Sequence, residues 1–175
     1  MANRWLHLLV DVLRSATGAS RRSAPSRRPG GTARGSAPTA ARYPGDFTGR
    51  VKAVYAPRLD GDPDPGEVVW TWVPYEEDHA QGKDRPVLLV GRDGPWLLAL
   101  QLTSKDHDRD AAQEARYGRR WMDVGSGTWD ARGRPSEVRL NRVVRVDPRA
   151  VRREGAVMDR RTFDAVVHEM ARARR

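Results

Sequence analysis

The sequence contains no cysteine among its 175 residues. Disulfides, thiolate nucleophiles, iron–sulfur clusters and cysteine-based zinc sites are therefore excluded. The 4 histidines do not form a spaced set of ligands, so we expect neither a metal ion nor another cofactor. A chain without cysteine agrees with a reducing compartment, and we expect a cytoplasmic protein.

The sequence also lacks a long hydrophobic run. No apolar stretch approaches the roughly 20 residues that a membrane-spanning helix needs, so we expect no membrane association. The segment WLHLLVDVLR, residues 5–14, has some features of a signal peptide, but His7 and Asp11 interrupt it and no small-residue cleavage site follows. A short terminal helix is the favoured interpretation, with a partner-binding helix or a signal as the alternatives.

Positive charge is plentiful but confined to the two ends of the chain. The formal net charge is +9, from 32 basic and 23 acidic residues. Residues 1–42 contribute +7 (8 Arg, 1 Asp) and residues 149–175 contribute +4 (8 Arg, 4 acids), which leaves −2 for residues 43–148. The basic ends favour weak, salt-sensitive attraction to polyanions.

Residues 15–42 consist only of Ser, Ala, Thr, Gly, Pro and Arg. Such a composition provides no side chains for a hydrophobic core, so we expect a disordered basic tail that touches RNA or DNA loosely at most. The chain is therefore predicted to divide into residues 1–42, a short helix plus tail, and residues 43–175, a folded domain.

Within that domain the patterns predict a mainly β fold. Val, Trp and Tyr are enriched in short segments separated by Gly, Pro and Asp, which is typical of strands joined by turns. The expected strands are residues 49–55, 67–75, 85–92, 96–104 and 136–148. A helix over 162–175 is indicated by the spacing of Phe163, Val166, Val167 and Met170, with Asp159 or Thr162 as its N-cap. Together these elements predict a small, bent antiparallel sheet or barrel with a C-terminal helix packed on it.

Four landmarks occur in a fixed order along these strands. They are the strand Gly66–Trp70, the approach Gly82–Pro86 to an aliphatic strand ending at Val90, the pair Thr103-Ser104, and the segment SEVRLNRVVRVDPRAV at 136–151. This order and spacing resembles the PemK/MazF family of toxin endoribonucleases. The resemblance covers about residues 66–170.

The resemblance implies both a fold and an activity. The implied fold is a compact SH3-like β-barrel of the PemK/MazF/CcdB kind with a C-terminal helix, usually forming a homodimer. The implied activity is metal-independent, sequence-specific cleavage of single-stranded RNA, including mRNA, by a toxin that is paired with an antitoxin protein. Such an antitoxin commonly occupies the RNA-binding groove.

The residues themselves suggest how such cleavage would work. Attack by the ribose 2′-OH creates a phosphate with extra negative charge, and a fixed cation stabilises it. Arg85 suits this role because its guanidinium is planar and always charged, and because Pro86 restricts its backbone. The predicted hairpin brings Thr103 and Ser104 close to it, so their hydroxyls would bind the same phosphate. The alternatives are an ion pair between Arg85 and Asp84, and strand-end caps at the two hydroxyl residues.

Other residues are candidates for proton transfer and RNA contact. His79, Asp106 and His107 lie in loops beside the predicted site and would exchange the 2′-OH proton. The expected RNA contacts are Lys83 and Lys105 for phosphates, and Tyr75 and Trp72 for stacking on a base.

A second function remains open at this point. The loop EEDHAQGKD, residues 76–84, is acidic where an RNA groove would prefer Lys and Arg. The same barrel could be catalytically weak and bind a protein or a nucleic acid, as a related barrel does that poisons DNA gyrase. A third reading is a domain that touches RNA only through its basic tails.

Overall fold

The computed structural model describes residues 43–58, 60–105 and 111–175. Its strands and helices, in chain order, are β1 (Glu67–Pro74), β2 (Gly82–Asp93), β3 (Trp96–Thr103), α1 (Ala111–Arg116), β4 (Trp121–Gly125), β5 (Ser136–Arg139), β6 (Val144–Val146), the 3-10 turn η2 (Pro148–Ala150), β7 (Arg153–Val157) and α2 (Arg160–Ala173). The predicted helix and tail in 1–42 lie outside the described residues, as do Asp106 and His107.

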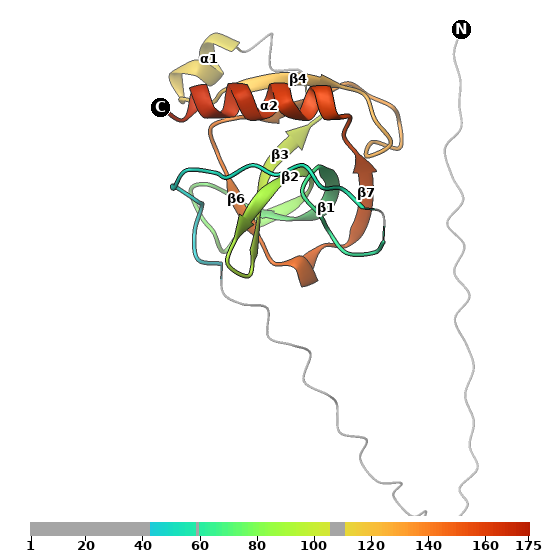
Figure 1. The fold of residues 1–175 in the computed structure, drawn as a ribbon. Helices are drawn as coiled ribbons and strands as arrows, with labels where there is room; N and C mark the ends of the chain where they lie inside the picture. The colour runs from blue at the N-terminus through green and yellow to red at the C-terminus, as the bar shows by residue number, and fades with distance from the viewer. Residues whose placement is uncertain (1–42, 59, 106–110) are drawn as a thin grey trace, which may run out of the picture. The chain divides into compact units, whose positions relative to one another are not determined.

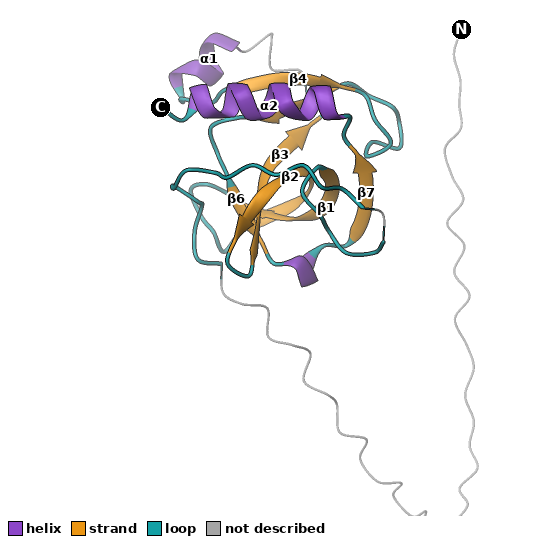
Figure 2. Ribbon diagram, viewed as in Figure 1, coloured by secondary structure: helices purple, strands orange, loops and turns teal. Residues whose placement is uncertain are grey.

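The strands form one antiparallel sheet that curls on itself. Its order is β4-β5-β3-β2-β1-β7, and β6 pairs with β3 beside this path. Figure 1 shows α2 lying across the curled sheet beside β4. Figure 2 shows the strands and the loops that connect them. The predicted mainly β fold, a compact barrel with a C-terminal helix, is confirmed, and the curled sheet forms a half-barrel.

The central strands are buried on both faces. The main core lies between the sheet and α2, where Leu88, Leu100 and Leu102 pack with Phe163 and Val166. The opposite face of the same strands carries a second cluster, formed by Val69, Val73, Val87, Leu89, Leu97, Ala99, Val144 and Val146. Burial on both faces explains why β2 and β3 read as unbroken aliphatic runs instead of alternating patterns.

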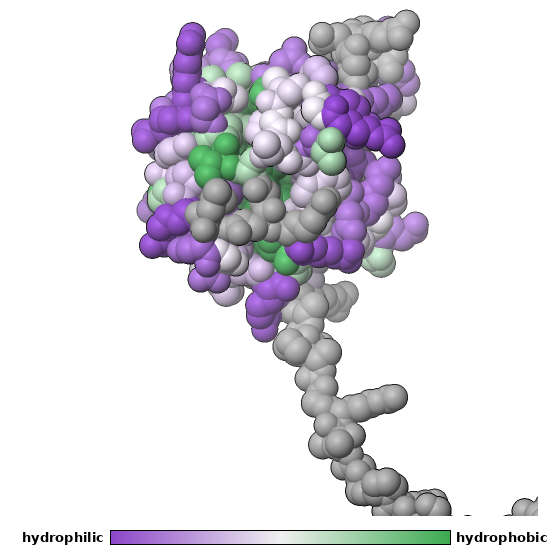
Figure 3. Space-filling view, turned by 90° about the vertical axis from the view of Figure 1, so that its right-hand side faces the viewer, coloured by the Kyte–Doolittle hydropathy of each residue, from purple (hydrophilic) through white to green (hydrophobic). Residues whose placement is uncertain are grey.

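The surface of the domain is mostly hydrophilic. Figure 3 shows polar side chains over most of one face, with a smaller apolar area near its centre. The large hydrophobic residues exposed among the described ones are Val54, Trp72, Tyr117 and Val157. No helix within the described residues is long and apolar enough to cross a membrane.

Two predicted elements differ from the structure. Residues 49–55 do not form a strand, although Val54 N–H donates a hydrogen bond of 3.0 Å to the carbonyl of Val90 in β2. This segment approaches so closely that a Cβ at Gly91 would lie 2.8 Å from the Lys52 carbonyl oxygen. The predicted strand 136–148 is two strands, β5 and β6, because the chain turns between Arg139 and Val144.

The C-terminal helix begins where the sequence indicated. The Asp159 side chain caps α2 by accepting a hydrogen bond of 3.0 Å from Thr162 N–H. Phe163, Val166 and Met170 are its buried residues, on the face that meets the sheet. Strand β7, just before this helix, was not predicted, and it pairs with β1 at one edge of the sheet.

Candidate functional site

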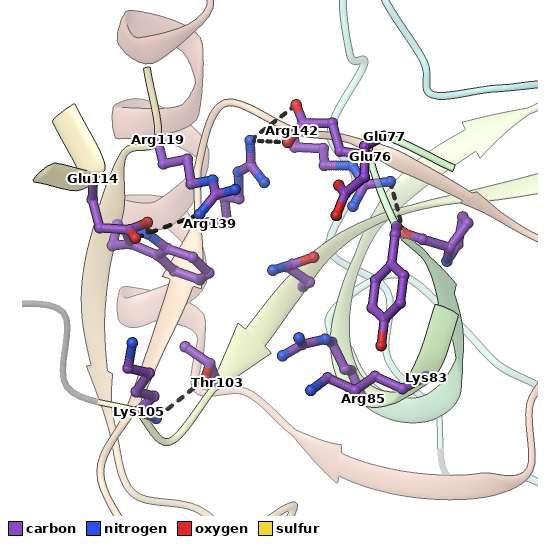
Figure 4. A pocket seen from close by; sticks show the side chains of 14 residues that line it. Glu76, Glu77, Lys83, Arg85, Thr103, Lys105, Glu114, Arg119, Arg139 and Arg142 are labelled. Carbon is purple, nitrogen blue, oxygen red and sulfur yellow. Dashed lines mark hydrogen bonds and ion pairs between the residues drawn. The ribbon is translucent and has the colours of Figure 1, made fainter. Parts of the chain in front are cut away.

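A pocket of about 400 Å³ lies at the end of the second apolar cluster, where several strands stop. Its floor is formed by the end of β1, the start of β2 and the end of β3. The opposite side, called the far wall below, is formed by α1, β4, β5 and the residues that follow β5 (Figure 4). The lining residues are Pro74, Tyr75, Glu76, Glu77, Lys83, Arg85, Gln101, Thr103, Lys105, Glu114, Arg119, Trp121, Arg139 and Arg142.

The strand register brings Arg85 and Thr103 together. In the antiparallel pair of β2 and β3, Val87 lies opposite Gln101. Continuing that register by two residues on each strand sets Arg85 opposite Thr103, on the same face of the sheet. Figure 4 shows both side chains in the lower part of the pocket, with the Arg85 guanidinium directed toward the Thr103 side.

Arg85 is half-buried, and no residue that the structure describes forms an ion pair with it. Its neighbour Asp84 binds Arg152 instead, with 2.6 Å between the guanidinium and the carboxylate. Among the described residues, no hydrogen bond or ion pair reaches the Arg85 guanidinium. Burial lowers the pKa of Arg85 from its ordinary value, Tyr75 opposes this shift, and the nearby Arg142 guanidinium adds to it. A guanidinium keeps its charge even so, which leaves a cation in the pocket that no described carboxylate neutralises.

The Thr103 hydroxyl lies in the pocket lining and is free to donate a hydrogen bond. Its Oγ1 accepts a hydrogen bond of 3.1 Å from the backbone N–H of Lys105. A hydroxyl that already accepts in this way still has its own O–H to donate. Thr103 is therefore suited to bind an anionic oxygen beside the Arg85 guanidinium.

Three further arginines line the pocket, and each has a carboxylate partner. Arg139 donates to both carboxylate oxygens of Glu76, at 2.8 and 3.1 Å. Arg142 binds Asp46 at 2.7 Å and the Pro74 carbonyl at 2.9 Å, while Arg119 approaches Glu114 at 3.5 Å. Burial lowers the pKa of Arg139, although its contact with Glu76 acts in the opposite sense.

Positive charge prevails in the lining as a whole. Six lining residues are cationic (Lys83, Arg85, Lys105, Arg119, Arg139 and Arg142) and three are acidic (Glu76, Glu77 and Glu114). Cations gathered in a concave surface attract anions more strongly than the same charges spread over a convex one. The pocket is therefore suited to a polyanion with several charges.

The structure brings together five of the predicted site residues. Arg85, Thr103, Lys83, Lys105 and Tyr75 all line the pocket. Arg85 and Thr103 form its floor, and the two lysines flank them on neighbouring strand ends (Figure 4).

Three other predicted residues lie outside the lining. Ser104 follows Thr103 but does not line the pocket. His79 packs edge-on against Tyr43, with 5.0 Å between the ring centroids. Trp72 points to the other face of β1, because its neighbour Thr71 is the residue opposite Arg85.

Sequence reasoning missed the arginines of the far wall. Arg139 and Arg142 lie among the apolar residues of VRLNRVV, for which the alternating pattern predicts only a strand. Both are buried, with 5% and 6% of their surface exposed. Two arginines within one short apolar segment were the available signal, since a buried charge requires a partner or a ligand.

Comparison with known proteins decides the family. Residues 64–173 match a family described as "PemK-like, MazF-like toxin of type II toxin-antitoxin system". The chain belongs to this family. The match covers more than half of the chain and contains every described residue of the pocket lining.

A solved structure and the curated proteins were also compared. The crystal structure of MazE-MazF (Form-II) from Deinococcus radiodurans is similar with 18% sequence identity and a TM-score of 0.43, over 63% of this chain and 93% of that chain. No curated protein matches. The predicted relationship to PemK/MazF toxins is confirmed by the family match.

Proposed function

We propose that this PemK/MazF-like protein is an endoribonuclease toxin that cleaves single-stranded RNA and thereby inhibits growth. The observation that carries the proposal is the half-buried Arg85, which has no ion-pair partner in the described part of the chain and faces Thr103 across the floor of a cationic pocket. Burying a cation without a partner costs free energy. Binding of an anion beside the cation recovers part of this free energy and therefore stabilises the complex. A phosphodiester in RNA is an anion that fits this site.

The proposed reaction uses the ribose as its own nucleophile. The 2′-oxygen attacks the adjacent phosphorus, and the bond between phosphorus and the 5′-oxygen breaks. The products are a 2′,3′-cyclic phosphate and a 5′-hydroxyl, and the proton lost from the 2′-OH is balanced by the one gained at the 5′-oxygen. Arg85 would stabilise the charge that develops on the phosphate oxygens, and Thr103 would donate a hydrogen bond to one of them.

The remaining roles follow from position. We propose that Lys83 and Lys105 hold neighbouring phosphates and that Tyr75 stacks on a base at the pocket edge. Asp106 and His107, which follow Lys105 directly in the sequence, are the proposed proton-transfer groups. His79 is the weaker candidate because it packs against Tyr43 and not into the pocket.

We further propose a cognate antitoxin protein and a homodimer as the partners of this chain. The family is described by its place in type II toxin-antitoxin systems, which supports an antitoxin partner. A pocket rich in cations would be blocked by an acidic segment of such an antitoxin, which would exclude RNA by occupying the same site.

The direct test is an RNA cleavage assay with the full-length protein in EDTA. We expect cleavage of single-stranded RNA that yields 2′,3′-cyclic phosphate and 5′-hydroxyl ends, measured by end-labelling before and after phosphatase treatment. Other product ends would contradict the proposed chemistry. Absence of cleavage would favour the alternative, a barrel that binds a protein such as DNA gyrase without cutting RNA.

The Thr103 hydroxyl gives a sharper prediction. Thr103→Val keeps the shape of the side chain but removes its O–H, so one hydrogen bond to a charged oxygen is lost. We expect kcat to fall by about 10- to 100-fold, which corresponds to the roughly 1.5–3 kcal/mol of such a bond. Thr103→Ser should retain most of the activity. An unaffected kcat in Thr103→Val would show that the hydroxyl only caps the strand end.

A further inference from the structure

Two of the cationic residues that line the pocket, Arg85 and Arg139, differ in their contacts. Arg85 has no partner among the described residues, whereas Arg139 is held by both oxygens of Glu76 (Figure 4). One nitrogen of Arg139, Nη2, donates to both carboxylate oxygens, and a phosphate oxygen could accept from the same N–H groups. Glu76 thus occupies a place in the pocket where a phosphate would fit.

We propose that Arg139 is a second phosphate-binding position, which takes a backbone phosphate of RNA adjacent to the one at Arg85, and that Glu76 fills it when RNA is absent. The proposal rests on the proposed function, since it extends the same site by one nucleotide. The acidic loop after β1 then has a purpose in an RNA-binding protein. It supplies an internal substitute for the ligand.

The two members of this pair differ in how firmly they are held. Arg139 ends strand β5 and its side chain is 6% exposed, whereas Glu76 lies in the loop after β1 and its side chain is 49% exposed. A half-exposed carboxylate regains water easily when it turns away, but a buried guanidinium that loses its partner does not. Arg139 is therefore the fixed part of the site, and Glu76 is the exchangeable one.

The neighbouring pair of Arg142 and Asp46 shows the contrast. Asp46 also accepts a hydrogen bond from the Tyr43 hydroxyl, and Arg142 also donates to the Pro74 carbonyl. Glu76 makes no side-chain hydrogen bond to a described residue other than Arg139. Both members of the Asp46 pair are tied into the fold, whereas in the other pair Arg139 has a further contact of 3.5 Å with Asn141 and only the Glu76 carboxylate is held by a contact that a ligand would replace.

The spacing of the two positions fits a nucleic-acid strand. In the pairing of β3 with β5, Leu102 lies opposite Val138 and Thr103 opposite Glu137. The same register places Arg139 opposite Gln101, so Arg139 is a diagonal neighbour of Thr103 on the shared face. Diagonal neighbours in a sheet are about 7–8 Å apart, and Arg85 lies one strand beyond Thr103, so the two arginines approach two neighbouring phosphates from opposite sides of β3.

The test is binding of a short oligonucleotide in which every ribose is 2′-deoxy, so that it cannot be cleaved by 2′-OH attack. Fluorescence anisotropy gives Kd for the full-length protein and its variants at one fixed low salt concentration. We expect Glu76→Gln to bind about 5- to 10-fold more tightly than the unaltered protein. Glu77→Gln removes the same charge from the same loop without breaking a contact to a described residue. We expect it to bind the oligonucleotide less than about 2-fold more tightly than the unaltered protein.

A second pair of variants tests the assignment to Arg139. In an Arg139→Gln background, Glu76→Gln should no longer improve binding, because the position that Glu76 vacates has lost its cation. Thermal unfolding of each variant checks that the proteins compared are folded. If Arg139→Gln fails to fold, the comparison of Glu76→Gln with Glu77→Gln still decides whether Glu76 competes with the oligonucleotide.

Three results would overturn the proposal. Equal Kd values for Glu76→Gln and Glu77→Gln would show that oligonucleotide binding depends only on the net charge of the loop and not on the contact between Glu76 and Arg139. Persistence of the Glu76→Gln gain without Arg139 would place the site elsewhere. Tighter binding of an oligoglutamate peptide to Glu76→Gln, with unchanged oligonucleotide binding, would assign Arg139 to a protein ligand. Because the oligonucleotide is not cleaved, each result is independent of whether the protein cuts RNA.

Discussion

Replacing Arg85 with alanine is expected to lower kcat for RNA cleavage by about 100- to 1000-fold. Removing one preorganised group that stabilises developing charge typically has an effect of this size, because the group is already in place and needs no reorganisation during the reaction. Arg85 meets this condition, since it is half-buried, extends from a strand and faces Thr103 without a partner of its own among the described residues. Initial rates in EDTA on a single-stranded RNA measure the effect.

The control for Arg85→Ala is Arg152→Ala. Arg152 directly precedes β7 in the sequence and lies near the start of β2 in space, because its guanidinium pairs with Asp84. It does not line the pocket. We expect its removal to change kcat by less than about 2-fold. The kcat of Arg85→Lys should lie between those of Arg85→Ala and Arg152→Ala. An ammonium group keeps the positive charge but lacks the planar geometry that contacts two oxygens at once. Equal activity in Arg85→Ala and Arg152→Ala would remove Arg85 from the mechanism.

The parts of the fold that the sequence predicts well are those decided by local burial. Strands β2 and β3 are buried on both faces at their centres, so their aliphatic runs are unmistakable, and the turn between them joins them as neighbours. The segment 49–55 has similar residues but forms no strand, because it contacts β2 through isolated hydrogen bonds such as that of Val54. Strand β7 contains few apolar residues, and it forms because the edge of β1 is available to pair with it.

The same distinction applies to the candidate site. Arg85 and Thr103 are predictable because a single hairpin determines their register. Trp72 stays a prediction as an RNA contact, and it lies outside the pocket lining because its position depends on which face of β1 meets the second cluster. Arg139 and its partner Glu76 are 63 residues apart in the sequence, and no local pattern indicates such a pair. The segment of the two far-wall arginines carries a signal in the sequence, but their pairing with Glu76 and Asp46 is a product of tertiary structure.

Loss of the Asp46 carboxylate is expected to destabilise the domain by about 3 kcal/mol in Asp46→Ala. Its partner Arg142 has a side chain that is only 5% exposed, and a buried charge that loses its partner is costly. The pair joins the segment before β1 to the turn between β5 and β6, and the Tyr43 hydroxyl also donates to Asp46. Urea unfolding followed by tryptophan fluorescence measures the free energy of unfolding.

The comparison for Asp46→Ala is Asp164→Ala. Asp164 pairs with Arg160 on α2, but both side chains are more than half exposed, so we expect a loss of less than about 1 kcal/mol. The double variant Asp46→Ala with Arg142→Met should recover part of the stability, since no unpaired charge then remains buried. Similar losses in Asp46→Ala and Asp164→Ala would show that Arg142 is reached by water.

Stability should also depend on pH through the same carboxylate. Burial raises the pKa of Asp46, but the hydrogen bonds from Arg142 and Tyr43 outweigh burial and hold the pKa below its ordinary value. A carboxylate with a lowered pKa in the folded state stabilises the protein above its unfolded pKa of about 4, and this contribution is lost as the pH falls through the folded value. The unaltered protein should therefore lose stability below about pH 4 more steeply than Asp46→Ala, because the variant has no carboxylate left to protonate at this position. Parallel curves for the two proteins would assign the acid sensitivity of the fold to other carboxylates.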